Sequence, residues 1–283
     1  MTESIVISNS VFIILGAELL FSLALPIAAI IIWKKKTDAS LSPFLMGAAA
    51  FFVFAMVLEQ IIHFLVLGLN SAVSDFILSR PWLYAVYGGL MAGLMEETAR
   101  FLVFKTMMRR NIGRENAVTY GLGHGGIECF IILGMSMISN LLLAAMFNSM
   151  GAEAFIAQYS PGQTEAVAAV IADINAVGPG TAALACFERA CSLALQVELS
   201  VLVFAAVRLN KFWLYPVSIL LHMGIDFFAA LYQTGTLTAL WAVEVMLGAY
   251  VVALCFAVCR VYKKLPPEAP TKMLDHFGRV VKG

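Results

Sequence analysis

The chain has 283 residues, of which 61% are hydrophobic and only 13% are charged, and its mean hydropathy is +0.89. A soluble domain of this length cannot keep so much apolar surface in water, so the composition excludes a soluble enzyme or a nucleic-acid-binding domain. The net charge is zero, but Lys and Arg are distributed unevenly along the chain.

Apolar runs follow one another along the chain, each long enough to cross a bilayer core of about 30 Å as a helix. They cover residues 5–33, 42–69, 81–108, 116–147, 182–207, 212–232 and 237–261. We therefore expect an all-α polytopic helix bundle, one transmembrane domain over residues 1–283 with a tail at 265–283. The first run has no basic start and no Ala-x-Ala exit, which favours a retained span over a signal peptide. Alanine, valine and isoleucine at helical spacing predict a short surface helix over 164–177.

The loops between these runs predict the orientation. Loops on one side hold fourteen basic residues, and loops on the other side hold only Arg80. The fourteen are Lys34, Lys35, Lys36, Arg109, Arg110, Arg114, Arg208, Lys211, Arg260, Lys263, Lys264, Lys272, Arg279 and Lys282. Because Lys and Arg accumulate on the cytoplasmic side, we expect seven spans in the cell membrane, with the N-terminus outside and the C-terminus inside.

The third run carries Glu96, Glu97 and Arg100 at its centre. A charge at this depth costs about 2.5–3.5 kcal/mol on insertion scales, so such residues are rare and usually functional. Glu96 and Arg100 are four residues apart and can pair on one helix face. Glu97 is rotated by about 100° and points elsewhere, so it needs a partner of its own. An ion pair that only fixes helix packing is the alternative for Glu96 and Arg100.

Two further runs each place a histidine four residues before a carboxylate. The fourth run holds His124 and Glu128 among four glycines, which let a neighbouring helix or a substrate come close. The sixth holds His222 and Asp226. In the second run, Glu59 and His63 share this spacing in reverse order and are expected to form a hydrogen-bonded pair, with metal ligation as the alternative. The fifth run contributes Glu188, Arg189 and Gln196.

Three of these side chains are expected at similar depths in the membrane. Glu96, His124 and His222 lie 8–12 residues from the expected cytoplasmic edges, which corresponds to about 12–18 Å at 1.5 Å per residue. They are therefore expected to meet in one cavity in the cytoplasmic half of the membrane. Glu59, Glu188 and Arg189 are expected in the outer half, as a separate structural group. A carboxylate and two imidazoles can activate water or bind a divalent metal, whereas no HExxH motif is present.

The ordered set Glu96-Glu97-x-x-Arg100, His124-Gly-Gly-x-Glu128 and His222-x-x-x-Asp226 resembles the YhfC branch of glutamic-type intramembrane proteases. This branch is similar to the CAAX prenyl proteases and the bacteriocin-processing proteins. The resemblance implies that Glu96 is the general base and that His124, His222 and Asp226 position the water and the oxyanion. It implies support from Glu97, Arg100, Glu128 and Gln196, and no resident cofactor.

The chain departs from its relatives in two places. Arg100 comes one residue sooner than in CAAX proteases. Gln196 stands where relatives tend to have a histidine, and glutamine can orient water but cannot accept a proton. A divalent metal is possible and would be held by Glu96, His124 and His222.

The function expected from the residues and the resemblance together is hydrolysis of a membrane-associated protein or peptide, with lipids as the other partners and no nucleic acid. The alternatives are an ion-coupled transporter, in which intramembrane acids and histidines relay protons, and a catalytically silent binding or immunity protein that uses the same cavity.

Overall fold

A computed structural model describes residues 6–37, 39–267, 273–274 and 280–281. Apart from two short antiparallel strands, β1 (Met273–Leu274) and β2 (Val280–Val281), the regular structure of these residues is helical. The all-α prediction is therefore confirmed. Most of the predicted tail lies outside the described residues, including its basic side chains Lys272, Arg279 and Lys282.

The helices follow the predicted runs closely, with short additional helices between them. In chain order they are α1 (Asn9–Lys36), α2 (Ser42–Phe51), the π-helix η1 (Phe52–Glu59), α3 (Gln60–Leu67), α4 (Ala72–Leu78), α5 (Pro81–Lys105), α6 (Glu115–Cys129), the π-helix η2 (Phe130–Gly134), α7 (Met135–Met150), α8 (Ala152–Tyr159), α9 (Thr164–Asn175), α10 (Pro179–Arg208), α11 (Leu214–Gln233) and α12 (Leu240–Tyr262). The surface helix predicted over 164–177 is α9, and α8 precedes it. The sequence patterns predicted neither α4 nor α8.

Six helical segments of the described chain are long and apolar enough to cross a membrane. They are Asn9–Lys36, Ser42–Leu67, Glu115–Met150, Pro179–Arg208, Leu214–Gln233 and Leu240–Tyr262. The third predicted run, α5, is not among them, although it has 25 residues. Its central charges, Glu96, Glu97 and Arg100, are buried inside the bundle, so lipid does not have to solvate them. The membrane-protein class is thus confirmed. The predicted count of seven crossings requires that α5 also crosses the membrane, in addition to the six segments above.

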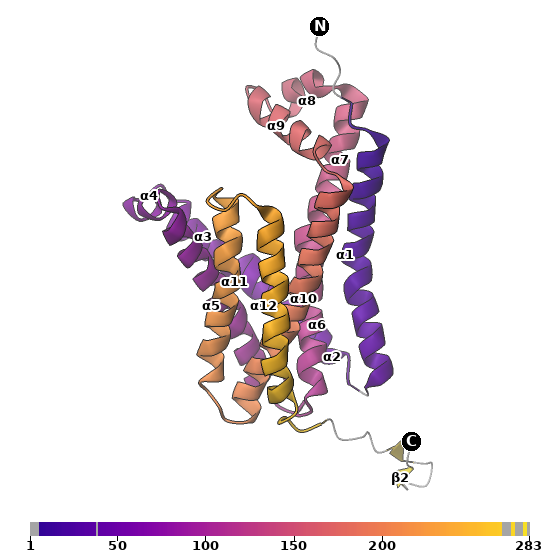
Figure 1. Cartoon of the computed structure of the whole chain (residues 1–283), viewed down its shortest axis with the longest axis vertical. Coiled ribbons are helices and arrows are strands. Elements are labelled where there is room, and N and C mark those ends of the chain that lie inside the picture. The colour runs from indigo at the N-terminus through magenta and orange to yellow at the C-terminus, as the bar shows by residue number, and fades with distance from the viewer. Residues whose placement is uncertain (1–5, 38, 268–272, 275–279, 282–283) are drawn as a thin grey trace.

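The helices form two packed groups (Figure 1). The larger hydrophobic core lies among α5, α6, α10, α11 and α12 and includes the buried side chains of Phe104, Tyr120, Leu199 and Phe204. The second core joins α1 and α7 to α8 and α9, which cap the end of the molecule near the N-terminus. The segment α2–η1–α3 runs obliquely from α6 to α4.

Glycines bring the helices that carry histidine into backbone contact with their neighbours. A Cβ atom at Gly123, beside His124, would lie 1.9 Å from the carbonyl oxygen of Phe44 on α2. A Cβ atom at Gly93 of α5 would lie 2.7 Å from the carbonyl oxygen of Ile219 on α11. Backbones can come this close only where one residue is glycine, and the glycines of the fourth run predicted such a contact. The two contacts join α2 to α6 and α5 to α11.

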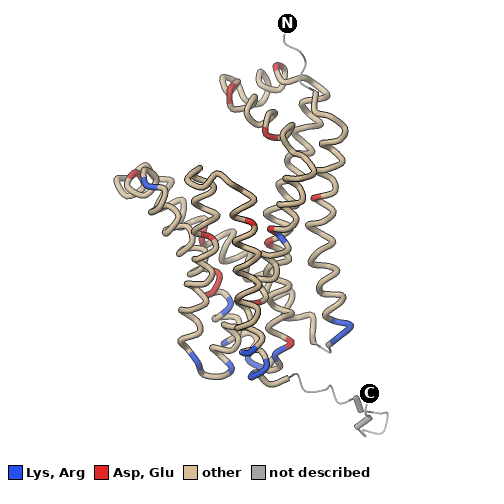
Figure 2. The backbone as a smooth tube through the Cα atoms, viewed as in Figure 1, with Lys and Arg blue, Asp and Glu red and all other residues tan. Residues whose placement is uncertain are grey.

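Charged side chains are segregated along the bundle (Figure 2). Lys and Arg gather where α1, α5 and α12 end, whereas the opposite end, with α8 and α9, carries acidic residues. The distribution follows the loop pattern from which the orientation was predicted. The orientation itself, with this basic end in the cytoplasm, stays a prediction.

Candidate active site

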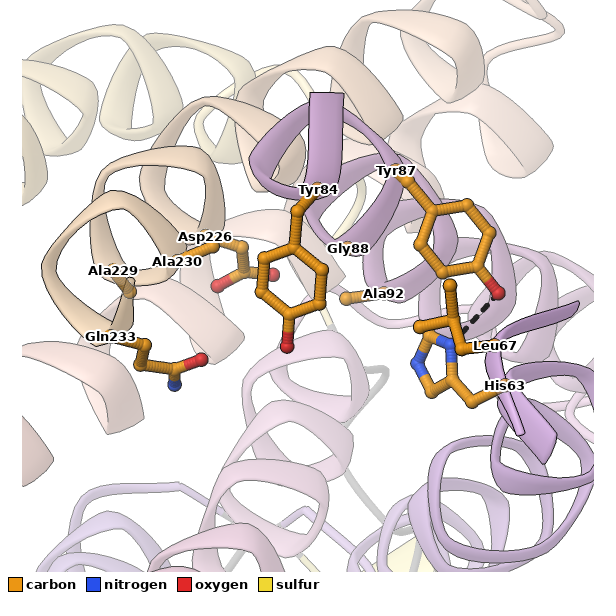
Figure 3. A pocket seen from close by; sticks show the side chains of 10 residues that line it. All are labelled: His63, Leu67, Tyr84, Tyr87, Gly88, Ala92, Asp226, Ala229, Ala230 and Gln233. Atoms are coloured by element: carbon orange, nitrogen blue, oxygen red, sulfur yellow. Dashed lines mark hydrogen bonds between the residues drawn. The ribbon is translucent and has the colours of Figure 1, made fainter. Parts of the chain in front are cut away.

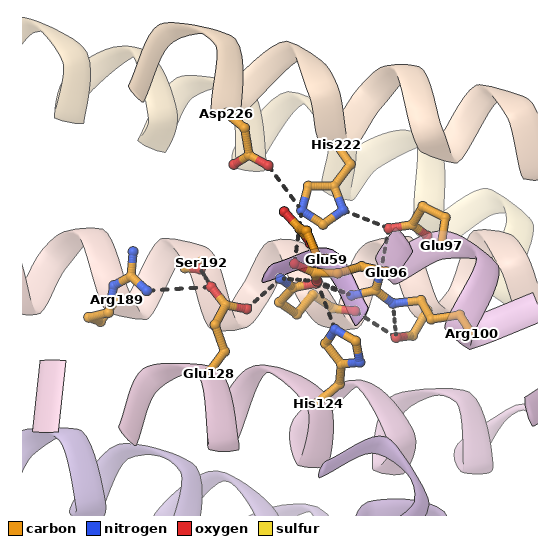
Figure 4. A network of polar contacts seen from close by, with 12 residues as sticks. Glu59, Glu96, Glu97, Arg100, His124, Glu128, Arg189, Ser192, His222 and Asp226 are labelled. Atoms are coloured by element: carbon orange, nitrogen blue, oxygen red, sulfur yellow. Dashed lines mark hydrogen bonds and ion pairs between the residues drawn. The ribbon is translucent and has the colours of Figure 1, made fainter. Parts of the chain in front are cut away.

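The charged residues at the centre of α5 meet polar side chains from α6, α10 and α11 in one continuous network (Figure 4). Glu96 Oε2 accepts hydrogen bonds from His124 Nε2 at 2.8 Å and from Gln196 Nε2 at 3.2 Å. Glu96 Oε1 lies 3.9 Å from His222 Nε2. The predicted convergence of Glu96, His124 and His222 is therefore present in the structure, and one carboxylate oxygen is held while the other faces His222.

Glu97 also belongs to this network, with Arg100 and His222 as its partners. Arg100 donates to Glu97 in a short ion pair, whereas its contact with Glu96 is longer, at 3.6 Å. His222 Nδ1 donates to Glu97 Oε1 at 2.8 Å. The predicted pair of Glu96 and Arg100 is therefore present, and Glu97 has a second partner in His222, as its need for a partner of its own predicted. Glu97 does not point away from Arg100, however, because the two side chains meet at a spacing of three residues.

Gln196 links the two ends of the network. Its side-chain oxygen accepts from Arg100, and its amide nitrogen donates to Glu96 and to Glu128. Glu128 also accepts from Arg189 at 3.4 Å, and Arg189 is paired with Glu188. The expectation of a separate group with Glu188 and Arg189 is therefore wrong, because Glu128 and Gln196 connect them to Glu96.

A cavity of about 670 Å³ lies next to the network, and Glu96, His222 and Asp226 line it. The residues of the site therefore form two layers, one at the cavity and one behind it. We call Glu96, His222 and Asp226 the cavity layer, and the three fully buried residues behind them, Glu97, Arg100 and His124, the buried layer. His124 is not among the residues that line the cavity; it packs edge-on against Phe51 and contacts Glu96 from behind. Its effect on chemistry in the cavity is therefore exerted through Glu96.

A smaller pocket of about 330 Å³ lies beside the cavity, between α3, α5 and α11 (Figure 3). The two share Ala92, Asp226, Ala229 and Gln233 as lining residues. Asp226 is the most exposed member of the cavity layer, with a side chain 33% accessible, and its Oδ2 lies 3.4 Å from His222 Nε2. The predicted pair of Glu59 and His63 is confirmed at 3.1 Å, next to the same pocket.

Several further partners were not singled out in the sequence. Ser200 accepts a hydrogen bond from Arg100 Nε, and Ser192 donates to Glu128 at 2.7 Å. Glu244 of α12 lines the cavity as well, and the available signal was a lone carboxylate in an apolar run. None of the hydrogen bonds in the described part of the chain joins a serine or cysteine to a histidine, so no serine or cysteine there is paired as an activated nucleophile.

The donor atoms of the cavity layer suit a divalent metal chemically. No three His, Cys, Asp or Glu side chains of the described residues already converge on one point. However, the 3.4 Å between His222 Nε2 and Asp226 Oδ2 is close to the separation of two tetrahedral ligands at about 2.1 Å from zinc. Glu96 Oε1 lies 3.9 Å from the same nitrogen, about 0.5 Å beyond that separation, so the side chains would have to move to bind one metal ion together. His222 is also oriented by Glu97, as a metal-bound histidine usually is.

The sequence profile of the YhfC intramembrane metalloprotease family matches residues 21–247. The chain is 35% identical over 240 residues to an uncharacterized membrane protein, YhfC, from Bacillus subtilis strain 168. That similarity covers 84% of this chain and 90% of the relative. No solved structure matches the chain.

Proposed function

The chain belongs to the YhfC intramembrane metalloprotease family, and we propose that it hydrolyses peptide bonds of a membrane-associated protein or peptide with Glu96 as the general base. The observation that carries this proposal is the unequal use of the two oxygens of Glu96. One is held by His124 and Gln196, and the other faces His222 at the cavity wall.

The separation of Glu96 Oε1 and His222 Nε2 suits a bridging water. With the two atoms 3.9 Å apart, one water oxygen can lie about 2.8 Å from each of them, and the two contacts then meet at an angle of about 90° at that oxygen. Glu96 would take a proton from this water as its oxygen attacks the scissile carbonyl carbon. When the C–N bond breaks, the same carboxyl group would return the proton to the leaving amine, and no covalent intermediate with the protein forms.

The hydrogen bond to Glu97 fixes the orientation of the His222 ring. Since Nδ1 donates to Glu97, a neutral His222 presents the lone pair of Nε2 to the cavity, and the tautomer follows from this hydrogen bond. Nε2 would then orient the water, with Asp226 beside it. His124 holds Glu96 from the buried side and is a positioning residue.

A divalent metal, when bound, would be held by Glu96, His222 and Asp226, and Glu96 would then act as a ligand in place of its role as the base. This set replaces the predicted set of Glu96, His124 and His222, because His124 is turned away from the cavity and its Nε2 is bonded to Glu96. The formal charges of Glu96, Glu97 and Asp226 exceed that of Arg100, which favours a cation at this point. When bound, such a metal supplies Lewis-acid polarisation of the carbonyl or of water.

The test uses the full-length protein in lipid nanodiscs with a set of hydrophobic peptides of about 20 residues, and detects the products by mass spectrometry. We expect cleavage by the wild-type protein and a loss of at least about 100-fold in Glu96→Gln, which is nearly isosteric. Metal content is measured on the same samples, before and after a chelator. Equal cleavage by both proteins would show that Glu96 is not the base.

A further inference from the structure

The cavity in front of Glu96 is strongly acidic. Its lining includes one guanidinium group, that of Arg189, and six carboxylates. The carboxylates are Glu59, Glu96, Glu128, Glu188, Asp226 and Glu244. Arg189 is already shared between Glu128 and Glu188, so it does not neutralise the others.

Four of these carboxylates accept hydrogen bonds, a fifth, Asp226, lies 3.4 Å from His222 Nε2, and Glu244 differs from all of them. Glu59 accepts from His63, Asp226 lies by His222, and Glu96, Glu128 and Glu188 belong to the network of Gln196 and Arg189. Glu244 is only 6% exposed, and its Oε2 has no hydrogen-bond partner among the described residues. Because buried charges are normally paired, a carboxylate that lines a cavity and lacks a protein partner points to a cationic ligand as that partner.

Glu244 lies near the beginning of α12, away from the Lys- and Arg-rich end of the bundle. The cavity extends in the same direction, because its lining includes Gln233 at the end of α11 and Leu240 at the start of α12. Segment 148–180, on the same side, contains acidic residues but no Lys or Arg. Apart from Arg80, the charged residues of the described loops on this side are acidic, which favours the approach of a cation.

We infer that Glu244, on a cavity wall that also includes Glu188 and Glu59, binds the cationic side chain of a Lys or Arg residue in the peptide substrate. The inference rests on the proposed function, since it assumes that a peptide occupies the cavity. Apolar lining residues such as Val243, Leu247 and Phe228 suit the alkyl part of such a side chain, while its charged end reaches Glu244. Lysine or arginine in the substrate would thus select the segment that is presented to Glu96.

The experiment measures binding separately from cleavage. Fluorescent hydrophobic peptides of about 20 residues, identical except for Lys, Gln or Glu at one of several central positions, are titrated against the protein in nanodiscs, and empty nanodiscs give the background. For at least one position, we expect the wild-type protein to bind the Lys peptide about tenfold more tightly than the Gln peptide. Glu244→Gln should reduce this preference to less than about twofold, and Glu244→Lys should reverse it in favour of the Glu peptide.

Glu198→Gln is the matched control. Glu198 of α10 is also 6% exposed and also has an unpartnered Oε2 among the described residues, but it does not line the cavity. It should keep the full preference for Lys. No Lys preference at any position, or equal losses in Glu244→Gln and Glu198→Gln, would overturn the inference. Cleavage of the same peptides is scored independently: a Lys preference in binding without any cleavage contradicts the proposed function and supports the cation site.

Discussion

The cavity layer and the buried layer contain the same kinds of side chain, yet the structure gives them different surroundings. In the cavity layer, the side chains of Glu96, His222 and Asp226 keep 8%, 4% and 33% of their accessible surface. The buried layer, with His124, Glu97 and Arg100, has none. The difference teaches that two adjacent carboxylates of one helix can serve different ends. Only Glu96 lines the cavity and can meet a substrate or water, whereas Glu97 is enclosed and its Oε1 is shared by Arg100 and His222.

The largest expected effect is a loss of turnover on substitution of Glu96, which should not occur to the same extent on substitution of Glu97. Glu96→Gln should lower turnover by about 10²–10⁴-fold, because an amide cannot accept the proton, with a small change in melting temperature. Glu97→Gln should instead destabilise the protein, since removing one partner of a buried ion pair costs about 3–5 kcal/mol. The folded fraction of Glu97→Gln should retain measurable turnover.

Rates and thermal unfolding of both variants, measured in the same detergent, provide this comparison. Glu18→Gln is the control for the substitution itself, because Glu18 is a buried carboxylate of α1 that does not line the cavity. If Glu97→Gln lost turnover as completely as Glu96→Gln at unchanged stability, the division into two layers would be wrong.

Arg100→Lys tests the buried layer alone. Lysine keeps the charge but cannot reproduce the contacts of the guanidinium with Glu97, Gln196 and Ser200. Each buried group left without a partner costs about 1–3 kcal/mol, so the melting temperature and the folding yield should fall together with activity. Arg80→Lys, at an exposed site, should leave both unchanged. Lost activity with wild-type stability would argue for a direct catalytic role of Arg100.

Gly123→Ala tests how the backbone positions the buried layer. The added methyl group would meet the Phe44 carbonyl oxygen, so α2 and α6 must separate and His124 must move. Overpacking of this kind costs about 1–3 kcal/mol. Gly88→Ala is the matched control, because a Cβ atom there has no neighbour within 4 Å and alanine favours the helix. Thermal unfolding should show destabilisation only for Gly123→Ala, and equal behaviour of the two variants would contradict the close α2–α6 contact.

The smallest effect is expected at the edge of the cavity layer. Asp226→Asn keeps the shape and one oxygen but removes a charge 3.4 Å from His222 Nε2. Because Asp226 is partly exposed, stability should be unchanged, while kcat/KM should fall about tenfold, or 1.4 kcal/mol. Metal content measured beside the rate shows whether the loss follows a metal. Unchanged kinetics would show that the charge of Asp226 does not contribute to turnover.

Much of this architecture could be predicted from the sequence because membrane insertion depends on local composition. Apolar length located the spans, and the rarity of charge inside them singled out Glu96, His124 and His222, which the structure brings together. The four glycines around His124 also indicated a close approach, and at Gly123 the structure shows such a helix contact. These inferences needed no knowledge of which helices are neighbours.

Only the tertiary structure decided which atoms pair and which face the cavity. Helical spacing predicted that Glu96 and Arg100 can pair, but only the packing of α10 and α11 shows that Arg100 also contacts Gln196 and that His222 contacts Glu97. Likewise, His124 and His222 look equivalent in sequence, and only the packing of Phe51 against His124 places it behind Glu96. Glu244 is the same case, because the sequence shows a lone carboxylate in an apolar run, whereas the fold of α10, α11 and α12 places it on the wall of the cavity. Such choices depend on distances between helices that are far apart in the chain, and the periodicity of a single helix carries no information about them.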